Sequence, residues 1–201
     1  MNAYATQDAG LKTLEIAHAY LREAAAAVPA DAWDNATPCD QWTVRQVLNH
    51  ARLDQQAYGY ALTGEDAPET DAFRPADTLT TDHAARLGHV LTRVHAAYAG
   101  LPAGTADVST PLGPLPAGVA ASAAALDAGV HAWDIAVATG QDHPLGEELA
   151  EGLWVAAERL ADTLRDAYRV FAPARTVDPA EGRAAQLLGF LGRDPHWVRP
   201  A

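Results

Sequence analysis

The chain has 201 residues, of which 49% are hydrophobic, so it can bury a substantial core and is not a disordered chain. Its formal net charge of −12 at pH 7 repels phosphate backbones and anionic lipid headgroups, which argues against nucleic-acid and membrane partners. The one cysteine, Cys39, allows no disulfide within the chain, and neither a signal peptide nor a run of about 18 apolar residues is visible. We therefore expect a single cytoplasmic domain over residues 1–201.

Apolar residues recur at helical spacing along most of the chain, and the many alanines add a high intrinsic helix propensity. Pro29 ends the first helical segment, and Thr43 with Gln46 three residues later forms a capping box that begins the second. Prolines and glycines crowd residues 101–118, which predicts an extended loop, and Gly140 stands where a left-handed C-cap is expected. The expected helices cover residues 8–28, 43–62, 81–98, 119–139 and 147–168, with a short terminal helix over 180–191.

The helix lengths favour an all-α bundle with little or no sheet, because no long stretch alternates with period two. Within such a bundle, Asp127 and His131 are four residues apart, so their side chains lie on one face about one turn apart. His50 borders the apolar stripe of another helix and is the leading candidate for a third ligand. Two nitrogens and one oxygen suit zinc and leave a fourth position open. From spacing alone, a histidine in such a helix is more often a packed or exposed residue than a metal ligand.

Three motifs occur in order along the chain. They are residues 37–45 (TPCDQWTVR) followed by Asn49 and His50, residues 127–136 (DAGVHAWDIA), and residues 187–195 (LLGFLGRDP). Together they resemble the DinB-like superfamily, and more narrowly the actinobacterial metal-binding branch related to the N-terminal domain of mycothiol-dependent maleylpyruvate isomerase.

This resemblance implies a DinB-like four-helix bundle, here with a short extra C-terminal helix, and a divalent metal, zinc in the first place and nickel in the second. Carried over residue by residue, the implied ligands are His50, Asp127 and His131. Relatives tend to have Glu or His where this chain has Asp127, and the shorter side chain predicts a tighter or weaker site.

Several nearby residues receive supporting roles. We expect Asp134 to orient the imidazole of His131, or to act at the helix terminus, rather than to bind the metal directly. His18 is interpreted as a hydrogen-bonded core histidine, with a place beside the cavity as the alternative. Cys39 is interpreted as a small buried residue because no adjacent base is evident, and Trp42 and Trp133 as core or pocket-wall residues.

The remaining histidines are not expected to contribute to the site. His83, His89 and His95 recur every six residues, so they do not share a helix face and are interpreted as surface residues. His143 and His196 are expected in loops without a paired partner.

The resemblance implies a thiol-dependent enzyme in which the metal binds and activates a low-molecular-weight thiol, mycothiol first, for S-transfer, conjugation or isomerisation. No catalytic side chain is assigned. Two alternatives stay open: a metal-dependent Lewis-acid or hydrolytic enzyme of secondary metabolism, and a non-catalytic protein that binds or sequesters a small molecule and has a structural metal. The expected partner is a small-molecule substrate, and the expected state is a monomer or homodimer.

Overall fold

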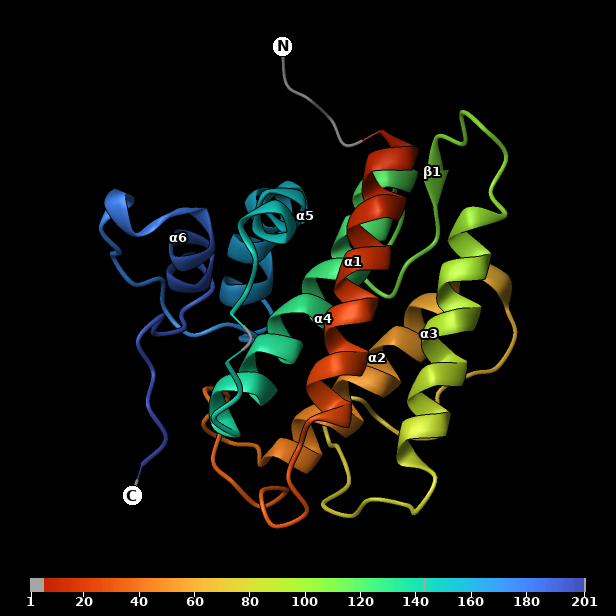
Figure 1. Ribbon diagram of the computed structural model, residues 1–201. Coiled ribbons are helices and arrows are strands. Elements are labelled where there is room, and N and C mark those ends of the chain that lie inside the picture. The colour runs from red at the N-terminus through yellow and green to blue at the C-terminus, as the bar shows by residue number, and fades with distance from the viewer. Residues whose placement is uncertain (1–5, 143, 201) are drawn as a thin grey trace.

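The structure, a computed structural model, describes residues 6–142 and 144–200. Its regular secondary structure is almost entirely helical (Figure 1), and the expected all-α bundle with a short C-terminal helix is confirmed. No helix in these two stretches is long and apolar enough to cross a membrane. The elements are α1 (Gln7–Ala26), α2 (Val44–Thr63), α3 (His83–Ala99), β1 (Asp107–Val108), β2 (Leu115–Pro116), α4 (Ala117–Ala138), α5 (Glu147–Asp166), the 3₁₀ turn η1 (Pro179–Glu181) and α6 (Arg183–Phe190).

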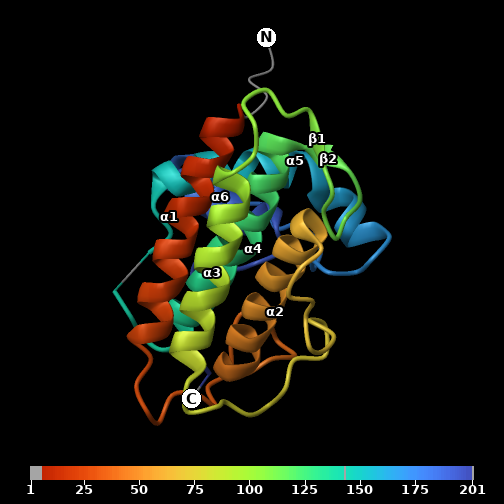
Figure 2. The same cartoon turned by 90° about the vertical axis from the view of Figure 1, so that its right-hand side faces the viewer.

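Helix α4 lies at the centre of the bundle. Every residue of α4 is buried except Asp127 and Val137, as expected for a helix that is apolar around its whole circumference. It packs against α1, α2 and α5, and Figure 1 shows α1 in front of it, α2 and α3 on one side, and α5 and α6 on the other. The view in Figure 2 shows α1, α3 and α2 side by side. Asp127 is therefore a carboxylate on a helix that otherwise belongs to the core.

Local signals set the helix ends close to where they were expected. The capping box at the start of α2 is present, and Gln46 Oε1 accepts a hydrogen bond of 3.0 Å from the Thr43 N–H. Gly140 is left-handed (φ 69°) after α4. The loop over 101–118 contains a two-residue antiparallel ladder that pairs β1 with β2. The terminal helix expected over 180–191 is broken, because Gly182 (φ 94°) adopts a non-helical conformation between η1 and α6.

Helices α1 and α4 approach each other closely through glycines. A Cβ atom added to Gly10 would lie well inside van der Waals contact with the backbone carbonyl of Gly118. The absence of a side chain at Gly10 therefore allows the backbones to meet. This contact fixes the position of α1 relative to the helix that carries Asp127.

We predict that Gly10→Ala lowers the free energy of unfolding by about 1–3 kcal/mol, because the backbones must separate to accept the methyl group. Gly88→Ala is the matched control: it lies within α3 and an added Cβ meets nothing within 4 Å, so higher helix propensity should stabilise the protein by up to about 1 kcal/mol. Chemical denaturation measures both. Equal stabilisation by the two substitutions would contradict the close α1–α4 contact.

Candidate metal centre

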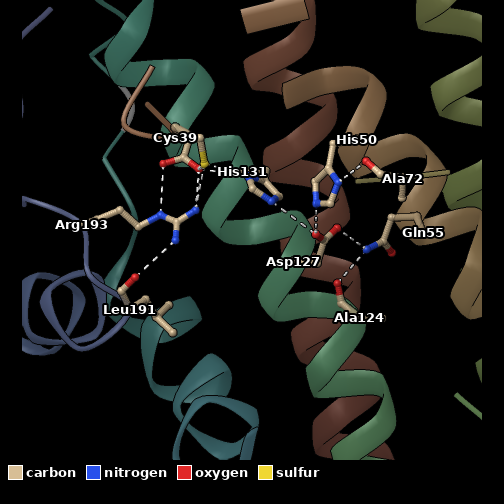
Figure 3. Close-up of polar contacts among 10 residues, drawn as sticks. Cys39, His50, Gln55, Ala72, Ala124, Asp127, His131, Leu191 and Arg193 are labelled. Atoms are coloured by element: carbon tan, nitrogen blue, oxygen red, sulfur yellow. Dashed lines mark hydrogen bonds and ion pairs between the residues drawn. The ribbon is translucent and has the colours of Figure 1, made fainter. Parts of the chain in front are cut away.

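Three side chains from two helices converge beside α4. His50 extends from α2, and Asp127 and His131 extend from α4 (Figure 3). The Oδ1 atom of Asp127 is 3.4 Å from His50 Nε2 and 3.5 Å from His131 Nε2. Ligands bound tetrahedrally to zinc at about 2.0–2.1 Å are separated by roughly 3.3–3.4 Å. The donor atoms therefore stand close to the spacing that one zinc ion requires.

Each imidazole is held by its other nitrogen. His50 Nδ1–H donates to the backbone carbonyl of Ala72 at 2.8 Å, and His131 Nδ1–H donates to Asp134 Oδ2 at 2.9 Å. A carbonyl and a carboxylate only accept hydrogen bonds, so both Nδ1 atoms carry the proton and the Nε2 atoms can offer lone pairs. This arrangement is typical of metal-binding histidines, and the donor set fits a divalent cation.

Asp127 is oriented by a chain of hydrogen bonds that begins on α1. Gln55 Nε2 donates to Asp127 Oδ2 at 3.0 Å and to the carbonyl of Ala124 at 2.8 Å, as Figure 3 shows. Because the Gln55 amide group donates twice, its Oε1 is left to accept from His18 Nε2–H at 2.9 Å. These contacts leave Asp127 Oδ1 directed at the two imidazoles, so the shorter aspartate still reaches both histidines.

The protonation of the triad follows from its burial and its charges. Burial disfavours charge on both His50 and Asp127. The hydrogen bond and charge of Asp127 outweigh that effect and raise the pKa of His50. Likewise, the hydrogen bond from His50 and the charges of both histidines hold the pKa of Asp127 below its usual value. The Asp127 carboxylate therefore stays ionised. A proton or a metal ion among the three side chains would balance its negative charge.

A second cluster, formed by Cys39, Asp134 and Arg193, contacts His131 on its Nδ1 side. Arg193 Nη2 donates to Asp134 Oδ2 at 2.9 Å and to Cys39 Sγ at 3.3 Å, and the Cys39 thiol donates to Asp134 Oδ2 at 3.2 Å. Burial would raise the pKa of Asp134, but the Arg193 charge and the hydrogen bond from His131 hold it well below its ordinary value. Burial and the Asp134 charge raise the pKa of Cys39, so the thiol stays protonated.

Cys39, His131 and Asp134 form another possible ligand group by distance. The buried guanidinium of Arg193 already supplies the positive charge there, and a cation would have to be placed against it. The cluster of His50, Asp127 and His131 has no such cation and is the better metal site.

Two cavities meet at the triad. One, of about 200 Å³, has mainly apolar walls and includes Asp54. The other, of about 250 Å³, is lined by more polar residues, including Asp40 and Gln41. His50 and His131 border both cavities. A ligand can therefore reach the triad from either side.

Asp54 adds a third carboxylate to this region. It lies on α2 one turn after His50 and is half-buried. Burial and the neighbouring charge of Asp127 raise the pKa of Asp54 to about 7, which places it near neutrality.

The structure brings together most of the residues singled out in the sequence. His50, Asp127 and His131 form one cluster, and Asp134 contacts His131. His18 is buried and reaches the triad only through Gln55.

The two tryptophans differ in position. The ring of Trp42 lies 4.5 Å from that of His50, so it forms part of the cavity wall. Trp133 is buried in the core.

Some interpretations of the other histidines were wrong. His196 Nε2 lies 2.6 Å from Glu181 Oε2, so His196 does have a partner, because η1 and the C-terminal segment fold against each other. His83 and His95 are half-buried, whereas His89 is exposed as expected. His143 lies outside the described residues.

Three residues at this site were missed from the sequence. Gln55 and Asp54 carry no local signal, because their partners lie elsewhere in the chain. Arg193 directly follows the apolar residues 187–192, and an arginine next to such a run is the one signal that could have indicated a buried ion pair.

Comparisons with known proteins agree with this architecture. Residues 14–136 match the family model described as the mycothiol maleylpyruvate isomerase N-terminal domain. Two uncharacterized proteins of Mycobacterium tuberculosis, Rv0738 and MT0763, are 32% identical to this chain over 183 residues, which cover 89% of this chain and 96% of theirs.

Crystal structures of mycothiol-dependent maleylpyruvate isomerase and of a mutant form share the fold. Their TM-scores are 0.68 and 0.66 at 15% sequence identity, over 96% of this chain and 91% of those chains.

The fold and the cluster define a helical-bundle protein with a candidate His/Asp metal site between two cavities. The chain belongs to the mycothiol maleylpyruvate isomerase N-terminal domain family.

We predict that Arg193→Leu lowers the free energy of unfolding by about 3–5 kcal/mol, because it leaves the Asp134 carboxylate buried without its cation. Arg93→Leu is the matched control: Arg93 pairs with Glu65 at the surface, with 43% of its side chain exposed, and should contribute less than about 1 kcal/mol. Chemical denaturation compares the two. Similar losses of stability in the two variants would show that the buried ion pair contributes no more than the surface pair.

The burial of His18 predicts a pH dependence of stability. Burial outweighs the hydrogen bond that His18 donates to Gln55, and the charges of Arg22 and His95 add to the effect of burial. The pKa of His18 therefore falls from 6.5 to about 4 despite the opposing charge of Asp127. Between these values the unfolded chain binds a proton that the folded protein does not. Stability therefore falls as pH decreases from about 6.5 to 4, by roughly 3 kcal/mol for this group. The His18→Leu variant should not show this part of the loss of stability. Chemical denaturation of the metal-free proteins across this pH range measures it, and parallel pH profiles for the variant and the parent protein would contradict the assignment.

Proposed function

We propose that this protein is a metal-dependent enzyme that uses a low-molecular-weight thiol, with mycothiol as the first candidate. The proposal places the metal between His50, Asp127 and His131. The observation that carries it is the geometry of the donors: two Nε2 atoms lie 3.4 and 3.5 Å from one carboxylate oxygen, and both Nδ1 atoms are anchored by hydrogen bonds.

Three protein ligands are the pattern of a catalytic site rather than a closed structural one. A divalent ion, zinc in the first place and nickel in the second, would bind a thiol at the remaining position and lower its pKa so that it is held as thiolate near neutral pH. The chain itself contributes orientation. Ala72 and Asp134 fix the two imidazoles, Gln55 fixes Asp127, and mainly apolar walls line one side of the site.

The chain's own thiol does not serve as the nucleophile in this proposal. Cys39 donates to Asp134 and its pKa is raised, so it stays protonated. The thiol must therefore come from a separate molecule. Membership of a family named for a mycothiol-dependent isomerase supports mycothiol, and an S-transfer, conjugation or isomerisation reaction follows from that chemistry.

One observation favours a second candidate function. Asp54 lines the apolar cavity one helical turn from His50 and is placed to accept a proton from a water molecule. A metal-dependent hydrolytic enzyme would use that arrangement. The absence of thiol-dependent turnover together with hydrolysis lost in Asp54→Asn would favour this candidate.

We predict about one divalent ion per chain after reconstitution with zinc. His131→Ala and His50→Ala should lose this ion, because either substitution removes one of three ligands, whereas His89→Ala at an exposed position of α3 should retain it. Elemental analysis of the dialysed proteins measures the content. Metal retained by His131→Ala, or absent from the parent protein, would refute the ligand assignment.

The thiol is tested in the same reconstituted protein with cobalt in place of zinc. Cys39→Ala removes the chain's own sulfur near the site, so a sulfur-to-cobalt charge-transfer band that appears on adding mycothiol to this variant must come from mycothiol. We expect that band, together with mycothiol-dependent conjugation of a model electrophile. A spectrum that does not change with mycothiol or other thiols, together with no thiol-dependent turnover, would exclude the thiol-dependent function.

A further inference from the structure

The apolar cavity beside the triad has the size and walls of a site for a small ring. Its volume is about 200 Å³, and its walls include Leu126 and Val130 of α4, Leu160 and Leu164 of α5, and Phe73. A dry cavity of about 150 Å³ is sufficient for benzene. One aromatic ring with small substituents would therefore fill this space and lie directly against the triad.

The charges around this cavity disfavour anions. Asp54 and Asp127 both line it, and among the described residues of its wall Arg193 is the only lysine or arginine. The guanidinium is already paired with Asp134 at 2.9 Å. In the metal-free protein, a carboxylate placed in the cavity would lose its hydration, find no free cation and face the carboxyl group of Asp54. The net charge of −12 adds a long-range repulsion.

The neighbouring cavity is more polar. Asp40, Gln41 and Arg169 line it, and the Arg169 side chain forms no ion pair within residues 6–142 and 144–200. A polar molecule that reaches the triad from this side can form hydrogen bonds and ion pairs that the apolar cavity does not offer. The two sides of the triad thus suit two molecules of different polarity.

We propose that the electrophile bound by this protein is uncharged and largely apolar, about the size of one substituted aromatic ring, and that the apolar cavity discriminates against carboxylates. The polar thiol would occupy the other cavity. The role of the ligand as an electrophile rests on the proposed thiol-dependent function. The binding preference rests only on the cavity walls, so the two can be tested separately.

The test compares 4-chloro-3-nitrobenzamide with 4-chloro-3-nitrobenzoate, which share one ring and differ by an amide in place of a carboxylate. Isothermal titration calorimetry of the metal-free protein, without thiol, measures binding by the cavity walls alone, because a zinc ion with an open position would itself bind a carboxylate. We expect the amide to bind at least about tenfold more tightly than the benzoate to this form, because unpaired burial of the carboxylate costs at least that factor.

Two variants and a control identify the cause of the preference. Leu164→Arg adds a cation at the half-buried cavity wall and should shift the preference towards the benzoate by at least about tenfold. Asp54→Asn, which removes charge with little change of shape, should tighten benzoate binding and leave amide binding within about twofold. Val198→Arg adds the same charge at a position that is 83% exposed and should leave the preference unchanged.

Benzoate binding as tight as amide binding in the metal-free protein overturns the proposal, and so does a failure of the amide to bind. A preference that neither Leu164→Arg nor Asp54→Asn alters also overturns it. A clear preference for the amide without any mycothiol-induced cobalt band would leave the cavity assignment standing and reject the thiol-dependent function. The reverse result would retain the thiol and reject the apolar ligand.

Discussion

The burial of α4 is the constraint on which the rest of this structure depends. A helix covered on all sides can carry ionised side chains only if partners from other elements compensate for their lost hydration. Asp127, His131 and Asp134 lie within two turns of this helix. Asp127 and Asp134 are therefore each matched by a group from a distant part of the chain, and these matches decide which segments must lie next to α4.

The partners come from nearly the whole length of the protein. Gln55 of α2 holds Asp127 and is itself held by His18 of α1, while Arg193 from the segment after α6 neutralises Asp134. The C-terminal segment is consequently part of the site rather than an appendage, because without Arg193 a fully buried carboxylate would have no cation. The same hydrogen bonds that stabilise the bundle also orient the three candidate ligands.

The candidate ligand atoms and the cavity walls around them determine different parts of the chemistry of this site. The two anchored imidazoles and the oriented carboxylate of Asp127 form one candidate coordination site. This arrangement does not specify a substrate. The walls of the adjoining cavities differ in polarity. Besides α2 and α4, those walls come from α5, from the segments after it, from residues 38–42 and 111–112, and from the loop that contains Phe73. Relatives with the same fold can therefore share a metal site and accept different molecules, because substrate choice depends on side chains that the bundle does not require.

The sequence by itself determined the elements and the local part of the site. Helical periodicity, the capping box at Thr43 and the glycine after α4 act within one or two turns, so the helices were predictable. The i, i+4 spacing also placed Asp127 and His131 on one face. Only the tertiary structure decided that His50 meets that face, that Gln55 and Arg193 hold its carboxylates, and that Asp54 borders an apolar cavity. These relations join residues far apart in the chain, and they arise from how buried surfaces and charges pair during packing, which no short-range pattern encodes.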